Sequence, residues 1–168
     1  MVGAPQHPAF ALTDHFGNRV TEEDFHGWFQ LVYFGFTSCR VVCPRALAKL
    51  SGVLGELGDE AAGSIRALYV TVDPARDKPE VMRAYLEAGY PRFLGLTGTE
   101  EAIEDAKKNF RVFAQRKAAP DDPDGYQIAH TAIAYLLDRN GNYLDHFPDA
   151  TEEARIIERI RFHLATPP

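Results

Sequence analysis

The sequence predicts a single α/β domain with a mixed central sheet, helices on both faces and an N-terminal hairpin extension. The chain has 168 residues, which is close to the length of one ordinary domain. A continuous apolar run at 31–36 is typical of a strand that is covered on both faces, and residues 65–72 are a second candidate for such a strand. A helix-length segment with leucines three or four residues apart separates them. This pattern indicates a βαβ unit, so we expect two parallel strands joined by a right-handed crossover.

Turn and cap residues divide the rest of the chain. Pro44 suits the first turn of a helix and Gly58 suits its end. Thr99 suits a helix N-cap, and Asn140 followed by Gly141 predicts a hairpin turn. In chain order we expect strands at 10–13, 19–21 and 31–36, a helix at 44–57, a strand at 65–72, helices at 79–88 and 99–110, strands at 132–137 and 143–147, and a helix from 149 or 151 to 164. This order fits a thioredoxin-like architecture over residues 1–168, with about residues 1–9 as a lead-in.

Residues 114–129 are predicted to form a long loop. Their centre, AAPDDPDG at 118–125, is acidic and rich in turn-forming residues. Loops of this length in compact domains tend to be functional or mobile. Because the segment ends at His130, we expect its motion to set where that imidazole lies.

Composition and charge exclude several classes of protein. With 45% hydrophobic and 25% charged residues, the chain is not intrinsically disordered. The net charge is −6 and no basic block occurs, which argues against a nucleic-acid partner. The sequence contains neither an apolar run of about 18 residues nor a visible signal peptide. We therefore expect either a cytoplasmic protein or a chain trimmed of an export signal or membrane anchor.

The two cysteines, Cys39 and Cys43, are the most informative feature. They lie where the first buried strand leads into the following helix, a place where open α/β sheets put ligands. Four residues of helix rise about 6 Å, a separation that permits either a disulfide or two sulfur ligands on one metal ion. The positive helix N-terminus and the charges of Arg40 and Arg45 are expected to favour thiolates. The alternative is a pair of small buried hydrophobic side chains.

A metal held by these sulfurs would be a soft ion, Cu(I) first and zinc second. Structural zinc sites usually use four protein ligands, and this chain offers only two sulfurs. Among six histidines, His130 is the best candidate for a third ligand because it ends the long loop and precedes a strand. His146 is a weaker candidate. The remaining histidines are expected to be solvated surface residues, namely His7, His15, His26 and His163.

Three segments together resemble the Sco/SenC family. They are GFTSCRVVCP at 35–44, TVDPARDKP at 71–79 and HTAIAYLLD at 130–138. The resemblance extends from about Phe10 to Leu164, and the three motifs in this order are specific. It implies a thioredoxin fold that binds one copper ion through Cys39, Cys43 and His130. His130 would then occupy the place of the cis-proline that thioredoxin-like proteins carry beside their cysteines.

The resemblance also implies a cellular location and a partner protein. Sco/SenC proteins are membrane-anchored, with this domain in the bacterial periplasm or the mitochondrial intermembrane space. They assist assembly of the dinuclear copper centre of cytochrome c oxidase subunit II, by delivering copper or by reducing its cysteines. The chain departs from the family pattern at Arg40, Val41 and Ala129, where a proline and two acidic residues are common. Less negative charge near the site is expected to lower the thiol pKa and weaken attraction for a cation.

Asp73 and Asp77 admit two interpretations. Either they orient a ligand or dock a partner at the strand end, or they are structural. In the structural case, Asp77 caps the next helix, Asp73 forms a turn with Pro74, and Arg76 pairs with one of them.

Three functions fit the cysteine pair. The first is a copper-binding assembly factor, and the second is a thiol–disulfide oxidoreductase that works without metal. The third is a peroxiredoxin-like peroxidase, although the Thr37 to Cys43 spacing does not match that of a peroxidatic cysteine. His130 separates the first two, because an imidazole beside the cysteines obstructs a substrate disulfide.

Overall fold

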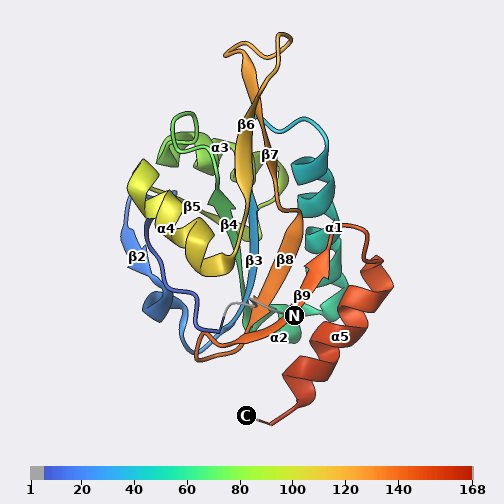
Figure 1. Cartoon of the computed structure of the whole chain (residues 1–168). Coiled ribbons are helices and arrows are strands. Elements are labelled where there is room, and N and C mark those ends of the chain that lie inside the picture. Colours follow the sequence, from blue (N-terminus) through green and yellow to red (C-terminus); the bar gives the residue numbers. More distant parts are fainter. Residues whose placement is uncertain (1–5, 168) are drawn as a thin grey trace.

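A seven-stranded mixed sheet forms the centre of the structure (Figure 1). The structure is a computed structural model that describes residues 6–167, so residues 1–5 of the expected lead-in lie outside the described residues. The strands are β1 (Ala11–Asp14), β2 (Arg19–Thr21), β3 (Phe29–Gly35), β4 (Ile65–Thr71), β5 (Phe93–Thr97), β6 (Ala114–Ala118), β7 (Tyr126–His130), β8 (Ile133–Leu137) and β9 (Tyr143–Pro148). The helices are α1 (Val42–Leu57), α2 (Asp59–Gly63), α3 (Pro79–Gly89), α4 (Glu100–Phe110) and α5 (Glu153–Ala165), with a short 3-10 turn η1 (Glu22–Phe25).

The order of strands in the sheet is β2-β1-β5-β4-β3-β8-β9. β3 and β4 are parallel neighbours joined through α1, which confirms the predicted βαβ unit. Both predicted hairpins, β1–β2 and β8–β9, are antiparallel pairs. The Thr99 side chain accepts a hydrogen bond from the backbone N–H of Ala102, so the expected cap of α4 is present. None of the helices within residues 6–167 is both long and apolar enough to cross a bilayer.

β5 was not predicted, yet it joins the N-terminal hairpin to the parallel strands. It pairs in parallel with β4 and antiparallel with β1. The strand is short, and Gly95 interrupts its apolar residues, which weakens the sequence signal for a strand. A side chain at this position would press on Met82 and Leu86, so the glycine lets α3 lie close to the sheet.

The sheet is covered by helices on both faces, as predicted. On one face, Cys43 of α1 lies beside Tyr69, and Met82 of α3 lies over Gly95. On the other face, the Phe34 ring packs against Phe110 of α4, with ring centroids 5.2 Å apart. α5 lies alongside α1 (Figure 1). The carboxyl end of β3 leads through residues 36–41, which include Cys39, into α1, and the carboxyl end of β4 leads into residues 72–78, which include Asp73 and Asp77.

The expected loop at 114–129 is instead mostly a hairpin. β6 and β7 pair antiparallel over five residue pairs and form a sheet of their own, separate from the seven-stranded sheet. The hairpin extends away from the body of the molecule (Figure 1). The prediction was wrong because β6 is polar and lacks alternating apolar residues, so only its pairing with β7 defines it as a strand.

Gly35 allows the closest packing near the cysteines. A Cβ atom there would lie 2.6 Å from the Tyr69 hydroxyl and 2.7 Å from the Cys43 sulfur. These distances are far shorter than van der Waals contacts, and both neighbours are fully buried. Gly35 therefore sets how near α1 approaches the end of β3.

We expect Gly35→Ala to lower the free energy of unfolding of the reduced protein by about 1–3 kcal/mol through overpacking. Urea denaturation measures the change. Gly55→Ala is the matched control, because a Cβ there meets no atom within 4 Å and alanine favours a helix. Equal unfolding midpoints for the two variants would contradict this account of Gly35.

Candidate metal centre

The two cysteines lie on either side of the junction between β3 and α1. Cys43 is the second residue of α1 and is fully buried, whereas Cys39 precedes the helix and is half-buried. The helical spacing assumed for the pair therefore does not hold, because Cys39 lies before the helix. A turn at the helix start still brings them together, because the backbone N–H of Cys43 points to the Cys39 sulfur at 3.4 Å.

His130 reaches this junction from the end of β7. Its Nε2 lies 3.2 Å from the Cys43 sulfur, although the two residues are 87 positions apart. The Nδ1 atom lies 3.0 Å from the carbonyl oxygen of Thr131, which accepts its proton. This contact selects the tautomer whose Nε2 lone pair faces the sulfur, as in many histidine ligands. The rings of Tyr33 and Phe36 meet the imidazole edge-on and limit its rotation.

The structure thus brings together the three predicted site residues. The sulfurs of Cys39 and Cys43 and a ring nitrogen of His130 all lie within 4.8 Å of one another. Two sulfur atoms and one imidazole nitrogen form a donor set suited to a soft metal ion. The group therefore fits a metal chemically as well as geometrically.

The two thiols differ in acidity. A hydrogen bond from Cys43 lowers the pKa of Cys39 well below the usual thiol range, against the effect of burial. The backbone N–H groups of Cys43 and Val41 also stabilise the Cys39 thiolate. The same contact with Cys39, together with burial, raises the pKa of Cys43. Cys39 is therefore the more acidic of the two thiols in the metal-free, reduced protein.

The arginines beside the cysteines form ion pairs with aspartates. Arg45 forms an ion pair with Asp149 at 2.7 Å, and Arg40 lies 4.0 Å from Asp122. We expected both arginines to favour thiolates, but hydrogen bonds from Cys43 and from the backbone at the helix start account for the low pKa of Cys39.

The other histidines within the described residues lie elsewhere. His146 contacts the Tyr143 hydroxyl, and His163 pairs with Asp145 at 3.0 Å. His7 and His26 are exposed, as expected. The expectation was wrong for His15, which is buried and accepts a hydrogen bond from a backbone N–H.

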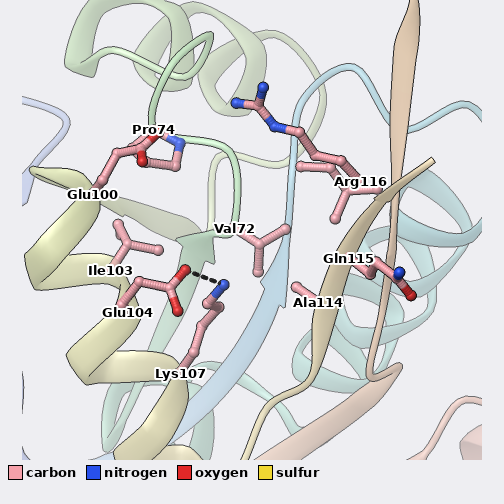
Figure 2. Close-up of a pocket in the computed structure, with 10 residues that line it drawn as sticks. Val72, Pro74, Glu100, Ile103, Glu104, Lys107, Ala114, Gln115 and Arg116 are labelled. Atoms are coloured by element: carbon pink, nitrogen blue, oxygen red, sulfur yellow. Dashed lines mark ion pairs between the residues drawn. The ribbon is translucent and has the colours of Figure 1, made fainter. Parts of the chain in front are cut away.

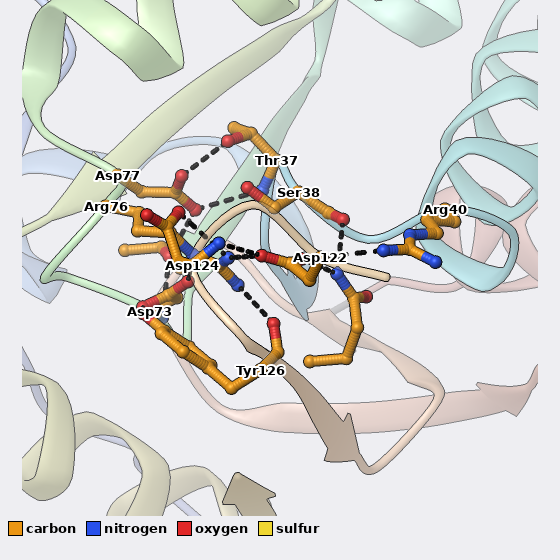
Figure 3. Close-up of polar contacts among 11 residues, drawn as sticks. Thr37, Ser38, Arg40, Asp73, Arg76, Asp77, Asp122, Asp124 and Tyr126 are labelled. Atoms are coloured by element: carbon orange, nitrogen blue, oxygen red, sulfur yellow. Dashed lines mark hydrogen bonds and ion pairs between the residues drawn. The ribbon is translucent and has the colours of Figure 1, made fainter. Parts of the chain in front are cut away.

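Asp77 is a structural residue, but it does not cap α3. The N-cap of that helix is Lys78, and the buried Asp77 carboxylate instead accepts hydrogen bonds from Thr37 and Thr71. Burial raises the pKa of Asp77, and these hydrogen bonds oppose that rise. Residues 36–41, which we call the cysteine loop, join β3 to α1. Since Thr37 lies near the start of this loop, two residues before Cys39, Asp77 holds the loop against the end of β4 (Figure 3).

Asp73 forms the predicted turn and also contacts the hairpin. Its backbone carbonyl accepts hydrogen bonds from the N–H groups of Arg76 and Asp77. Its carboxylate pairs with Arg76 at 2.6 Å and accepts a hydrogen bond from the Tyr126 hydroxyl at 2.8 Å. The sequence did not indicate the contact with Tyr126, which links segments 53 residues apart.

A separate cavity of about 270 Å³ lies between α4 and the β6–β7 hairpin (Figure 2). Its charged lining includes Glu104 and Lys107, which pair with each other, and Arg116. No cysteine or histidine lines it, so it is distinct from the candidate metal centre.

Comparison with known proteins gives consistent matches. The sequence model of the SCO1/SenC family matches residues 3–165. Protein sco1 of Schizosaccharomyces pombe is 42% identical over 148 residues, which cover 87% of this chain and 56% of that protein. The mitochondrial SCO2 homolog of Danio rerio is 40% identical over 159 residues, covering 94% of this chain and 56% of that protein. The chain thus spans little more than half the length of these relatives.

Solved structures agree with the sequence matches. ScoI of Bradyrhizobium japonicum with copper bound has a TM-score of 0.81 and 33% sequence identity, covering 92% of this chain and 96% of that one. Such neighbours have the thioredoxin-like fold that the sequence predicts. With a family match over nearly its whole length, the chain belongs to the SCO1/SenC family.

Proposed function

We propose that the protein is a copper-binding metallochaperone that holds one Cu(I) ion through Cys39, Cys43 and His130. The observation that carries this proposal is the placement of two sulfurs and one imidazole nitrogen within 4.8 Å of one another. The tautomer of His130 leaves Nε2 free as a ligand, and Cys39 already favours the thiolate. The similarity to ScoI with copper bound supports copper as the ion.

The ligand set favours copper over zinc. Cu(I) is stable with two thiolates and one imidazole, whereas structural zinc usually takes four protein ligands. Only two cysteines occur in the chain. Binding a cation also removes the penalty on the Cys43 thiolate, because the metal replaces its proton.

The proposed recipient is the dinuclear copper centre of cytochrome c oxidase subunit II. A three-ligand site can pass copper on, because an incoming sulfur ligand can bind before the donor releases the ion. The relatives support a location on the periplasmic face of the bacterial inner membrane or in the mitochondrial intermembrane space, since they include a mitochondrial protein and a bacterial one. We propose that the native protein is held there by a membrane anchor.

The second candidate function is a thiol–disulfide oxidoreductase that keeps partner cysteines reduced. The difference between the thiols favours it, because a half-exposed thiolate beside a buried thiol is the arrangement of an attacking and a resolving cysteine. The imidazole of His130 against Cys43 favours the copper function instead, since thiol exchange does not need it.

We expect His130→Ala to weaken Cu(I) binding by roughly 100-fold or more, because losing even an outer-shell partner of a metal ligand costs about 10- to 100-fold. Anaerobic titration of the reduced protein against a Cu(I) chelator measures the affinity. His146→Ala is the matched control, since His146 contacts Tyr143 and not the cysteines.

X-ray absorption of the copper-loaded wild-type protein should show two sulfur neighbours and one nitrogen neighbour. A copper environment of nitrogen and oxygen alone would rule out the proposed site. Unchanged affinity in His130→Ala would remove His130 from the ligand set.

We expect mild oxidation to join Cys39 and Cys43 in a reversible disulfide and to abolish Cu(I) binding, because a disulfide sulfur is a poor ligand. Mass spectrometry after alkylation should show the loss of two hydrogen atoms. Added dithiothreitol should restore copper binding fully. Two alkylated cysteines after prolonged oxidation would instead argue against both the disulfide and the reductase function.

Cys39 should react with iodoacetamide at acidic pH, where ordinary thiols do not. Its pKa is lowered, so its thiolate persists as the pH falls below neutrality, whereas Cys43 stays a buried thiol. Peptide mapping of the metal-free, reduced protein at several pH values measures both rates. In Cys43→Ala the reaction of Cys39 should move to higher pH, because its main hydrogen-bond donor is lost. An identical pH profile in that variant would assign the low pKa to another cause.

A further inference from the structure

The position of His130 depends on what holds the β6–β7 hairpin. His130 is the last residue of β7, and this hairpin pairs with no strand of the seven-stranded sheet. Only one side chain of its two strands is buried, that of Ile128. Apolar packing therefore contributes little to fixing the hairpin, and polar contacts have to supply the rest.

Arg76 makes most of those contacts from the body of the protein. Its guanidinium lies 2.6 Å from the Asp73 carboxylate, which anchors it to the end of β4. On the hairpin side it lies 2.9 Å from Asp122, 3.3 Å from Asp124 and 3.3 Å from the carbonyl oxygen of Tyr126. It also stacks 3.9 Å from the Tyr126 ring centroid. One cation thus joins the β4 turn to the turn of the hairpin (Figure 3).

Asp122 continues the connection to the cysteine loop. Gln127 donates hydrogen bonds from one amide nitrogen both to Asp122 and, at 3.0 Å, to the carbonyl oxygen of Ser38. The Arg40 guanidinium, from between the two cysteines, lies 4.0 Å from the same carboxylate. The hairpin is therefore tied to residues on both sides of Cys39 (Figure 3).

Asp122 is buried in an unusual place. It lies in an exposed, acidic turn, yet its side chain is only 3% exposed. Its neighbour Asp121 is exposed. A hydrogen bond from the backbone N–H of Asp124, with those from Gln127 and Arg76, keeps the pKa of Asp122 below its ordinary value. A buried carboxylate with these partners stabilises one position of the hairpin against others.

We propose that Arg76 and Asp122 form a latch that positions His130 as a copper ligand by closing the β6–β7 hairpin over the cysteine loop. The inference rests on the proposed copper function. With the latch closed, the imidazole of His130 lies 3.2 Å from the Cys43 sulfur. With the latch open, His130 moves away with β7 and leaves a two-sulfur site on Cys39 and Cys43. Arg76 and Asp122 are positioning residues, since neither contacts the three ligand side chains.

The test uses Asp122→Asn, which keeps the size of the side chain and its turn with Asp124 but removes the charge that pairs with Arg76. The reduced 168-residue chain is titrated with Cu(I) against a chelator. We expect roughly tenfold weaker binding, the lower end of the range for outer-shell residues. Asp121→Asn, which removes the same charge from the same turn, should leave the affinity unchanged.

A double-mutant cycle separates positioning from general destabilisation. If the latch acts through His130, adding Asp122→Asn to His130→Ala should cause no further loss of Cu(I) affinity. A tenfold loss that persists in the His130→Ala background would overturn the proposal, as would wild-type affinity in Asp122→Asn alone.

Hydrogen exchange of the metal-free protein tests the latch without copper. Asp122→Asn should speed amide exchange across Tyr126–His130 at least about tenfold relative to Asp121→Asn, while exchange in β3 and β4 stays unchanged. Equal exchange in the two variants would overturn the latch. If the wild-type protein bound no Cu(I), the proposed function would be wrong. The hydrogen-exchange comparison would still test the latch, because it uses the metal-free protein.

Discussion

The contact between the Cys43 sulfur and Nε2 of His130 is the constraint on which the site depends. The two atoms belong to parts of the fold that share no strand pairing, because α1 follows β3 of the seven-stranded sheet and β7 belongs to the separate hairpin. Gly35 brings α1 close enough at the end of β3, and Asp77 fixes the loop before Cys39 through Thr37. Gly35 acts on α1 and Asp77 acts on the cysteine loop, so the arrangement of the three site residues depends on both contacts together.

Burial gives the two sulfurs different roles at this contact. Cys43 lies between the sheet and α1, where its thiolate is costly, and the half-exposed Cys39 takes the negative charge from the hydrogen bonds of its neighbours. The two candidate functions share this asymmetry. What separates them is the imidazole, which is a good metal ligand and an obstacle to thiol exchange.

The sequence predicted the elements whose signals are local. The apolar run at 31–36, the strand-forming residues at 65–72, the Thr99 cap and the Asn140-Gly141 turn each specified an element within a few residues of its observed position. β5 and the β6–β7 hairpin were missed, because pairing with distant strands, or with each other, defines them. The motifs singled out Cys39, Cys43 and His130, and the structure places them together. The environment of Asp122 could not be predicted, since its partner Arg76 is 46 residues away and nothing in the acidic turn marks one carboxylate for burial.

The way the hairpin is held bears on how a metal could leave the site. A hairpin packed through many apolar side chains would hold His130 permanently, because separating such a surface exposes a large area to water. This hairpin buries little more than Ile128 and is tied by ion pairs and hydrogen bonds, which water and a charged partner can replace. The polar residues of a docking protein could therefore compete for Arg76 or Asp122 without unfolding the sheet. In the proposed copper function, the strand–helix junction would retain both sulfurs, while His130 would be released at the moment when a recipient is present.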